Sequence, residues 1–184
     1  MRPLAAALAV ALALPVPALA RGVAGVEVPE SATLSGQPLT LNGAGIRRKF
    51  FVQVYVGALY LPARTGDAAA ILAADAPWLV SMTFRRDVDK EKILEAFRES
   101  FERNSESELA QLLPGLARFG EVLPDLSSGQ VLTVDYRPGI GTTLTAPGGA
   151  AVTVPGRAFG VAILRSWLGD RPADDDLKKA MLGR

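Results

Sequence analysis

The chain has 184 residues, of which 49% are hydrophobic, and its 20 basic side chains face 19 acidic ones. This near balance gives no general electrostatic attraction for nucleic acid, so no nucleic-acid partner is expected. Cysteine and histidine are both absent, which excludes disulfide bonds, zinc sites built on those residues, and catalysis by Ser-His-Asp or Cys-His groups. An all-carboxylate metal site stays open, but no spacing typical of a calcium loop occurs. We therefore predict no metal and no other cofactor.

The first twenty residues, "MRPLAAALAVALALPVPALA", have the pattern of a secretory signal peptide. A basic start is followed by a short apolar run and by small residues that end at Ala20. Two prolines interrupt the run, which makes it a poor membrane-spanning helix, although an uncleaved anchor is the alternative. We predict cleavage after Ala20, and a single domain over residues 21–184 located in the periplasm. No other long apolar run occurs, so no stable membrane insertion is expected of that domain.

Most of the first half is predicted to be β-structure. Residues 21–37 read as an extended lead-in that contains a short strand at "VEVP". The dipeptide Asn42-Gly43 then predicts a turn. A further strand is predicted over residues 78–84, "WLVSMTF", because its residues are mostly aliphatic or aromatic.

The longest predicted strand covers residues 50–61, where β-branched and aromatic residues predominate. Successive side chains of a strand point to opposite faces. One face of this strand is therefore apolar throughout, whereas the other carries Gln53, Tyr55 and a glycine. Such a strand is expected to be covered on one side and to line a partly polar space on the other.

Two helices are predicted to follow the strand at residues 78–84. The first begins after Asp87 or Asp89 and reaches about Arg103, with apolar residues at four-residue spacing along one face. The second is predicted to open with a capping box formed by Ser105 and Glu108.

The last third alternates again between strands and helices. Residues 130–154 contain three strand-like segments separated by Pro-Gly and Gly-Gly turns, which predicts an antiparallel meander. A helix over residues 157–168 is followed by a second one after Pro172. The acidic residues Asp174–Asp176 suit the positive end of that last helix dipole. The order of elements indicates an α+β fold with an antiparallel sheet and helices on one face.

Two segments together resemble the chalcone isomerase-like family. They are residues 43–62, "GAGIRRKFFVQVYVGALYLP", and residues 157–183, "RAFGVAILRSWLGDRPADDDLKKAMLG". The strand, helix pair and meander between them follow the order of that family, so the resemblance covers nearly the whole chain after residue 20. It implies an open-faced β-sandwich, in which a curved antiparallel sheet and a helical layer on one face form a ligand cleft.

The resemblance also implies three site residues. The family includes plant enzymes that cyclise chalcones, fatty-acid-binding relatives without known chemistry, and secreted bacterial members like this one. Arg47 matches the arginine that polarises the substrate in the enzymes. Tyr55 stands where the enzymes have a threonine, as in the fatty-acid-binding branch, and Ser166 corresponds to a polar residue on the late helix.

One departure from the enzymes counts against chalcone cyclisation. The enzymes use a tyrosine and an asparagine from the helix after the third strand, and the segment from Arg85 to Arg103 contains neither. Without them the phenolic rings of a chalcone lose their orientation for attack, and orientation supplies much of such a rate.

Each site residue also has a purely structural interpretation. Arg47 is also explained as an exposed charge at a strand end, Tyr55 as a half-buried strand aromatic, and Ser166 as a serine that bonds back to the preceding helical turn. Eight residues of straight strand would place Arg47 and Tyr55 roughly 26 Å apart. The two residues can share a ligand only if the chain turns between Arg48 and Phe51.

The sequence thus supports three hypotheses about function. We favour a secreted, non-catalytic protein that binds a fatty acid or a similar small amphipathic carboxylate between sheet and helices, through Arg47, Tyr55 and Ser166. The first alternative is an isomerase or lyase acting on an enone, with Arg47 as electrophile and Tyr55 as acid. The second alternative is an interaction module of the cell envelope without a small ligand. The sequence leaves the oligomeric state open.

Overall fold

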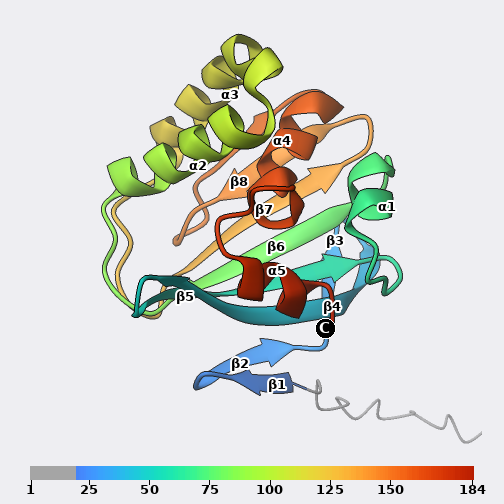
Figure 1. Ribbon diagram of the computed structural model, residues 1–184, viewed down its shortest axis with the longest axis vertical. Coiled ribbons are helices and arrows are strands. Elements are labelled where there is room, and N and C mark those ends of the chain that lie inside the picture. The colour runs from blue at the N-terminus through green and yellow to red at the C-terminus, as the bar shows by residue number, and fades with distance from the viewer. Residues whose placement is uncertain (1–19) are drawn as a thin grey trace, which may run out of the picture.

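A long antiparallel sheet runs through the computed structural model, which describes residues 20–184 (Figure 1). The predicted signal peptide lies outside the described residues, apart from Ala20. The strands are β1 (Ala20–Val23), β2 (Val26–Pro29), β3 (Ser31–Leu34), β4 (Gln37–Lys49), β5 (Val52–Leu61), β6 (Trp78–Phe84), β7 (Val131–Arg137), β8 (Gly141–Thr145) and β9 (Ala151–Val154). The helices are α1 (Ala68–Ala73), α2 (Lys90–Asn104), the short 3₁₀ helix η1 (Glu106–Glu108), α3 (Leu109–Val122), α4 (Arg157–Leu168) and α5 (Asp175–Met181).

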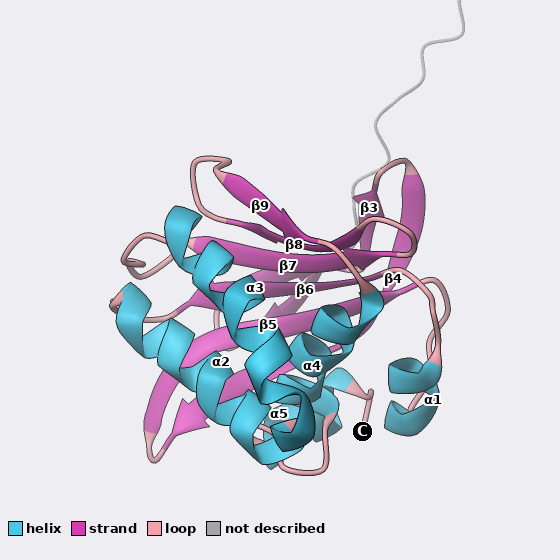
Figure 2. Ribbon diagram, turned by 90° about the horizontal axis from the view of Figure 1, so that it is seen from above, coloured by secondary structure: helices cyan, strands magenta, loops and turns pink. Residues whose placement is uncertain are grey.

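The main sheet is a meander in which each strand pairs with its neighbour in sequence. Its order is β3-β4-β5-β6-β7-β8-β9, and every pairing is antiparallel. Helices α2 to α5 cover one face of this sheet (Figure 2), and the separate β1–β2 hairpin lies beyond β4 on the other side (Figure 1). This arrangement confirms the predicted α+β class with a curved, open-faced antiparallel sheet and one helical layer. None of the helices within residues 20–184 is long and apolar enough to cross a membrane.

Two apolar clusters hold the layers together. The larger one lies between the main sheet and the helices, and its fully buried members include Leu59, Val80, Phe101, Phe119 and Ile163. The smaller one fills the space between the β1–β2 hairpin and the other face of β4 and β5, and it consists of Val28, Leu39, Leu41, Val56, Ala58 and Tyr60. The alternation predicted for residues 50–61 therefore holds in the second half of β5, because its even residues serve one cluster and its odd residues the other.

The turn predicted at Asn42-Gly43 is wrong, because β4 continues through both residues. The pairing of β4 with β5 shifts between Leu41 and Gly43, so Asn42 forms a β-bulge. The bulge directs the buried Asn42 side chain to the C-terminal end of the chain. There its Nδ2 donates to the carbonyl oxygens of Met181 (2.7 Å) and Thr65 (3.0 Å), and its Oδ1 accepts from the Thr65 amide (2.8 Å).

The glycine beside this bulge is explained by helix packing. A Cβ built on Gly43 would lie 2.0 Å from the Ala180 carbonyl oxygen, and one on Gly45 would lie 2.5 Å from the Ala180 Cβ. Both positions face α5, whose backbone therefore approaches β4 more closely than any side chain would allow. Gly43 is therefore needed for the packing of α5 against β4 and not for a turn.

The predicted capping box at Ser105 and Glu108 is also wrong. The Ser105 side chain makes no capping hydrogen bond, and α3 begins only at Leu109, after the 3₁₀ turn. The Ser105 hydroxyl instead accepts a hydrogen bond from Arg165 Nη1 at 3.0 Å, because α4 packs directly against the end of α2. The acidic cluster before α5 agrees better with expectation. Asp174 caps that helix by accepting from the amides of Asp176 and Leu177.

We predict that Gly43→Ala lowers the free energy of unfolding by at least about 2 kcal/mol, because the added methyl group meets a helix backbone that cannot rotate away. The measurement is urea unfolding followed by circular dichroism. The matched control is Gly22→Ala in β1, where the nearest atom to a new Cβ is a glutamate oxygen at 3.7 Å. A change in Gly43→Ala no larger than in that control would contradict the packing of α5 described here.

Candidate functional site

A tight turn at Phe50-Phe51 brings Arg47 and Tyr55 together. The last pair of the β4–β5 hairpin is Lys49 with Val52, and Arg47 pairs directly with Tyr55 across the two strands. The Arg47 Cζ lies 5.7 Å from the centre of the Tyr55 ring, in cation–π contact. The separation of roughly 26 Å that a straight strand would impose is thus removed by the hairpin.

A second bulge shapes the wall of the site. Pairing moves from Arg47 with Tyr55 to Arg48 with Gln53, which leaves Val54 unpaired in β5. A bulge re-aims the side chains beside it, and Val54 lines the same cavity as Tyr55. The strict alternation predicted for residues 50–61 is therefore wrong at this end of the strand, where it would have placed Val54 on the opposite face.

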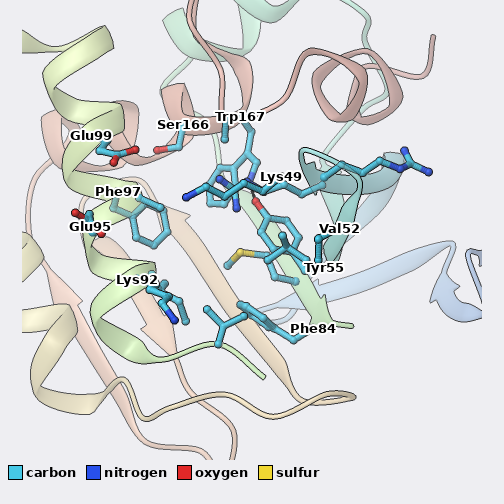
Figure 3. Close-up of a pocket in the computed structure, with 18 of the residues that line it drawn as sticks. Lys49, Val52, Tyr55, Phe84, Lys92, Glu95, Phe97, Glu99, Ser166 and Trp167 are labelled. Atoms are coloured by element: carbon cyan, nitrogen blue, oxygen red, sulfur yellow. Dashed lines mark hydrogen bonds between the residues drawn. The ribbon is translucent and has the colours of Figure 1, made fainter. Parts of the chain in front are cut away.

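The cavity has a volume of about 710 Å³ and lies between the β4–β5 hairpin, α2 and the segment that joins α4 to α5 (Figure 3). Its size is within the range of roughly 300–1,000 Å³ that is usual for small-molecule sites. Arg47, Tyr55 and Ser166 all line it. The apolar part of the lining comes from Phe50, Val52, Val54, Met82, Phe84, Val88, Ile93, Ala96, Phe97, Trp167, Pro172 and Ala173.

Tyr55 is held as a neutral phenol with a proton to donate. Its hydroxyl oxygen accepts a buried hydrogen bond of 2.8 Å from Trp167 Nε1, so the O–H hydrogen is left for another acceptor. Burial raises the pKa of Tyr55 above its ordinary value, although the Arg47 charge and the Trp167 hydrogen bond oppose that shift. At neutral pH Tyr55 is therefore a hydrogen-bond donor and not a base.

Ser166 presents an unpaired hydroxyl to the cavity. Its side chain is 4% exposed, and within residues 20–184 its Oγ has no hydrogen-bond partner. The structural interpretation, a bond back to the preceding helical turn, is therefore wrong. In Figure 3 the Ser166 hydroxyl is directed across the cavity toward Glu99 on α2. A buried hydroxyl without a protein partner within the described residues can form a hydrogen bond with a molecule in the cavity.

The mouth of the cavity is positively charged. Six basic residues line it, namely Arg47, Arg48, Lys49, Arg86, Lys92 and Arg103, against three acidic ones, Asp87, Glu95 and Glu99. Arg103 is paired with Glu99 at 3.4 Å. None of the three hairpin cations forms a salt bridge within the described part of the chain. The unpaired charge favours an anionic group at this end of the cavity.

Trp167 has a role that sequence reasoning missed. Its ring packs edge-on against Phe97 at the end of α4, with ring centres 5.9 Å apart. Its indole N–H also fixes the Tyr55 hydroxyl. No local pattern indicates this contact, because the two residues are 112 positions apart in the chain. Within residues 20–184 no group of three acidic residues is placed to hold a metal ion.

Fold and site together define an α+β protein with one open-faced sheet and a ligand-sized cleft beneath its helical layer. The family model described as chalcone isomerase-like matches residues 20–183, and the chain belongs to that family. Its structure is similar to the crystal structure of a fatty-acid binding protein of Arabidopsis thaliana, with a TM-score of 0.67 and 16% sequence identity. The match covers 86% of this chain and 92% of the plant protein, which shows a common fold. No curated protein matches the sequence significantly.

All three tyrosines of the chain are predicted to resist ionisation in the folded state. Burial raises the pKa of Tyr60 and of Tyr136 to about 12, and that of Tyr55 is raised as well. Unfolded tyrosines ionise near pH 10. The contribution of the three tyrosines to the free energy of unfolding should therefore be constant up to about pH 10. Above pH 10 the free energy of unfolding should fall, because the unfolded chain loses protons that the folded chain retains.

The measurement is the ultraviolet absorbance of tyrosinate during alkaline titration, with near-ultraviolet circular dichroism recorded in parallel. The two signals should change together, above pH 10. A tyrosinate signal with a midpoint near pH 10 and unchanged circular dichroism would contradict the burial of these phenols.

Proposed function

We propose that the protein is a secreted, periplasmic and non-catalytic binding protein for a fatty acid or a similar small amphipathic carboxylate. The observation that carries this proposal is the convergence of Arg47, Tyr55 and Ser166 on one cavity whose remaining lining is largely apolar. The proposed secretion rests on the first twenty residues of the sequence. Membership of the family and the structural likeness to a fatty-acid binding protein of Arabidopsis support the choice of ligand class.

The three polar groups suit the two oxygens of a carboxylate. The guanidinium of Arg47 offers a planar pair of donors. The Tyr55 hydroxyl has a free proton because Trp167 occupies its acceptor side, and the Ser166 hydroxyl has no partner of its own. An alkyl chain would lie against the apolar lining, where each buried methylene contributes about 0.8 kcal/mol. Chain length would then set affinity more than the head group does.

Binding is better supported than enone chemistry. The cavity side of α2 consists of Lys92, Ile93, Glu95, Ala96, Phe97, Glu99 and Arg103, so it offers no tyrosine or asparagine to orient a phenolic ring. A Tyr55 hydroxyl whose pKa is raised is a poor general acid. Turnover of chalcones or other enones by the purified protein, lost in Tyr55→Phe, would favour the isomerase or lyase instead. A protein that carries no lipid and binds none would favour the envelope interaction module.

We expect Arg47→Ala to weaken fatty-acid binding at least about tenfold, because the carboxylate loses its cationic partner. Native mass spectrometry identifies the lipid that co-purifies, and displacement of a fluorescent fatty acid then gives the affinity. Arg118→Ala is the matched control, because Arg118 is exposed on α3 and does not line the cavity.

A second comparison isolates the head group. The corresponding fatty alcohol lacks the charge, so its affinity should change little between the native protein and Arg47→Ala. Equal losses for the acid and the alcohol would show that the substitution damages the cavity in general. Unchanged affinity for the acid would refute the role assigned to Arg47.

Ser166→Ala should separate stability from binding. The Ser166 hydroxyl is buried without a partner, so its removal is expected to leave the free energy of unfolding of the ligand-free protein unchanged or higher by up to about 1 kcal/mol. Affinity for the carboxylate should fall, because one donor is lost. A marked loss of stability together with unaltered affinity would show that the hydroxyl serves the fold and not the ligand.

A further inference from the structure

The tip of the β4–β5 hairpin exposes two adjacent phenylalanines. Phe50 is 85% exposed and Phe51 is 94% exposed, and Val52 beside them is 38% exposed. The other large apolar side chains exposed within residues 20–184 are single and less exposed, the highest being Ile140 at 50%. Isolated apolar residues on a surface are ordinary, but a continuous apolar group marks an interaction site.

The backbone of this tip is strained in a way that a different sequence would avoid. Phe50 is the first residue of a two-residue hairpin turn and has a φ of +57°. Glycine adopts such an angle without cost, whereas a bulky side chain does so rarely. Phenylalanine is therefore less stable than glycine at this position. Backbone strain of this kind is concentrated at functional sites.

Five cations lie near the two phenylalanines, along the chain or on the neighbouring strand. Arg47, Arg48 and Lys49 precede them in β4, and Arg85 and Arg86 follow the end of β6. The Arg85 amide donates to the Val54 carbonyl at 2.9 Å, which places these arginines next to the hairpin. None of the five cations forms a salt bridge within residues 20–184. Exposed aromatic rings among unpaired cations are the features of a segment that enters the interface of an anionic bilayer.

We propose that the hairpin tip, residues 47–52 with Arg85 and Arg86, docks the protein on the surface of an anionic lipid bilayer. Charge complementarity favours lipid head groups as the partner. Shape favours them too: a stable protein partner needs about 800 Å² on each side, far more than a two-residue turn presents. A bilayer requires only that the two rings enter its interface while the cations meet its phosphates. Figures 1 and 2 show this hairpin at a corner of the molecule.

Docking in this way would turn the cavity toward the bilayer. Lys49, Phe50 and Val52 belong to the tip and also line the cavity. If the proposed function holds, an amphipathic ligand passes between membrane and cavity without crossing water. The docking itself does not depend on that function, since vesicle binding and fatty-acid binding are measured separately.

The test is sedimentation of the protein with vesicles. Binding is expected to vesicles of phosphatidylglycerol mixed with phosphatidylcholine, at least about tenfold more strongly than to phosphatidylcholine alone, and to weaken as the salt concentration rises. Phe51→Ser should reduce binding to the anionic vesicles at least about tenfold, because one of the two rings that enter the interface is lost. Phe51 does not line the cavity, so fatty-acid affinity in solution should stay unchanged in this variant.

Two further variants make the result specific. Ile140→Ser removes an exposed apolar side chain from the β7–β8 turn at the opposite end of the sheet, and it should leave vesicle binding intact. Phe51→Trp keeps an aromatic ring at the tip, and its added emission should shift to the blue and be quenched by brominated lipid on anionic vesicles.

Three results would overturn the docking proposal. The first is equal vesicle binding by Phe51→Ser and the native protein. The second is a fluorescence emission of Phe51→Trp that vesicles do not alter. The third is light scattering that shows that the tip joins two copies of the chain. Each of these would leave fatty-acid binding untouched. Conversely, a failure of Arg47→Ala to weaken fatty-acid binding would leave the docking result standing.

Discussion

The register of the β4–β5 hairpin is the constraint on which the site depends. It places Arg47 opposite Tyr55, and the C-terminal segment holds it in place. Asp174 Oδ2 accepts from the Arg48 amide at 2.7 Å, while Trp167 bonds to Tyr55. A shift of one residue would move Tyr55 to the other face of the sheet. Residues 43–62 and 157–183, the two segments that resemble the family in sequence, are thus also the two that meet in space.

Much of the fold could be predicted because the spacing of apolar residues along the sequence indicates which side of a helix or strand is buried. β6, α2, α4 and the final meander agree with expectation, and β6 and α2 each bury one apolar face. The errors have a common physical cause. Asn42-Gly43 looks like a turn because the partner that requires a glycine there, α5, is more than 130 residues away. The true turn, at Phe50-Phe51, carries no turn residue at all.

Three residues that line the cavity could be named from the sequence, but their geometry could not. Arg47, Tyr55 and Ser166 come from a resemblance, and they line one cavity. The sequence did not show whether Arg47 and Tyr55 lie close together. The alternation of side chains is the same in one straight strand as in two strands joined by a turn. The balanced net charge of the chain also hides the local excess of positive charge at the hairpin, because net charge is a sum over the whole surface. Some cations elsewhere are paired, as in Arg98 with Glu102, whereas within residues 20–184 the three adjacent cations of the hairpin form no salt bridge. A head group within a Debye length of about 10 Å responds to this local excess.

The chemistry of the cavity depends on two hydroxyl groups, those of Tyr55 and Ser166, which donate no hydrogen bond to any described residue. Two hydroxyls are buried there, and each keeps a proton that no described residue accepts. Burial that raises the pKa of Tyr55 makes it a weaker acid but a constant donor, because it stays protonated over the whole neutral range. Such donors gain from an incoming carboxylate without any proton transfer, since the ligand satisfies groups that the fold leaves unsatisfied. In the proposed function, the same two donors would therefore bind the carboxylate without acting as a general acid or base.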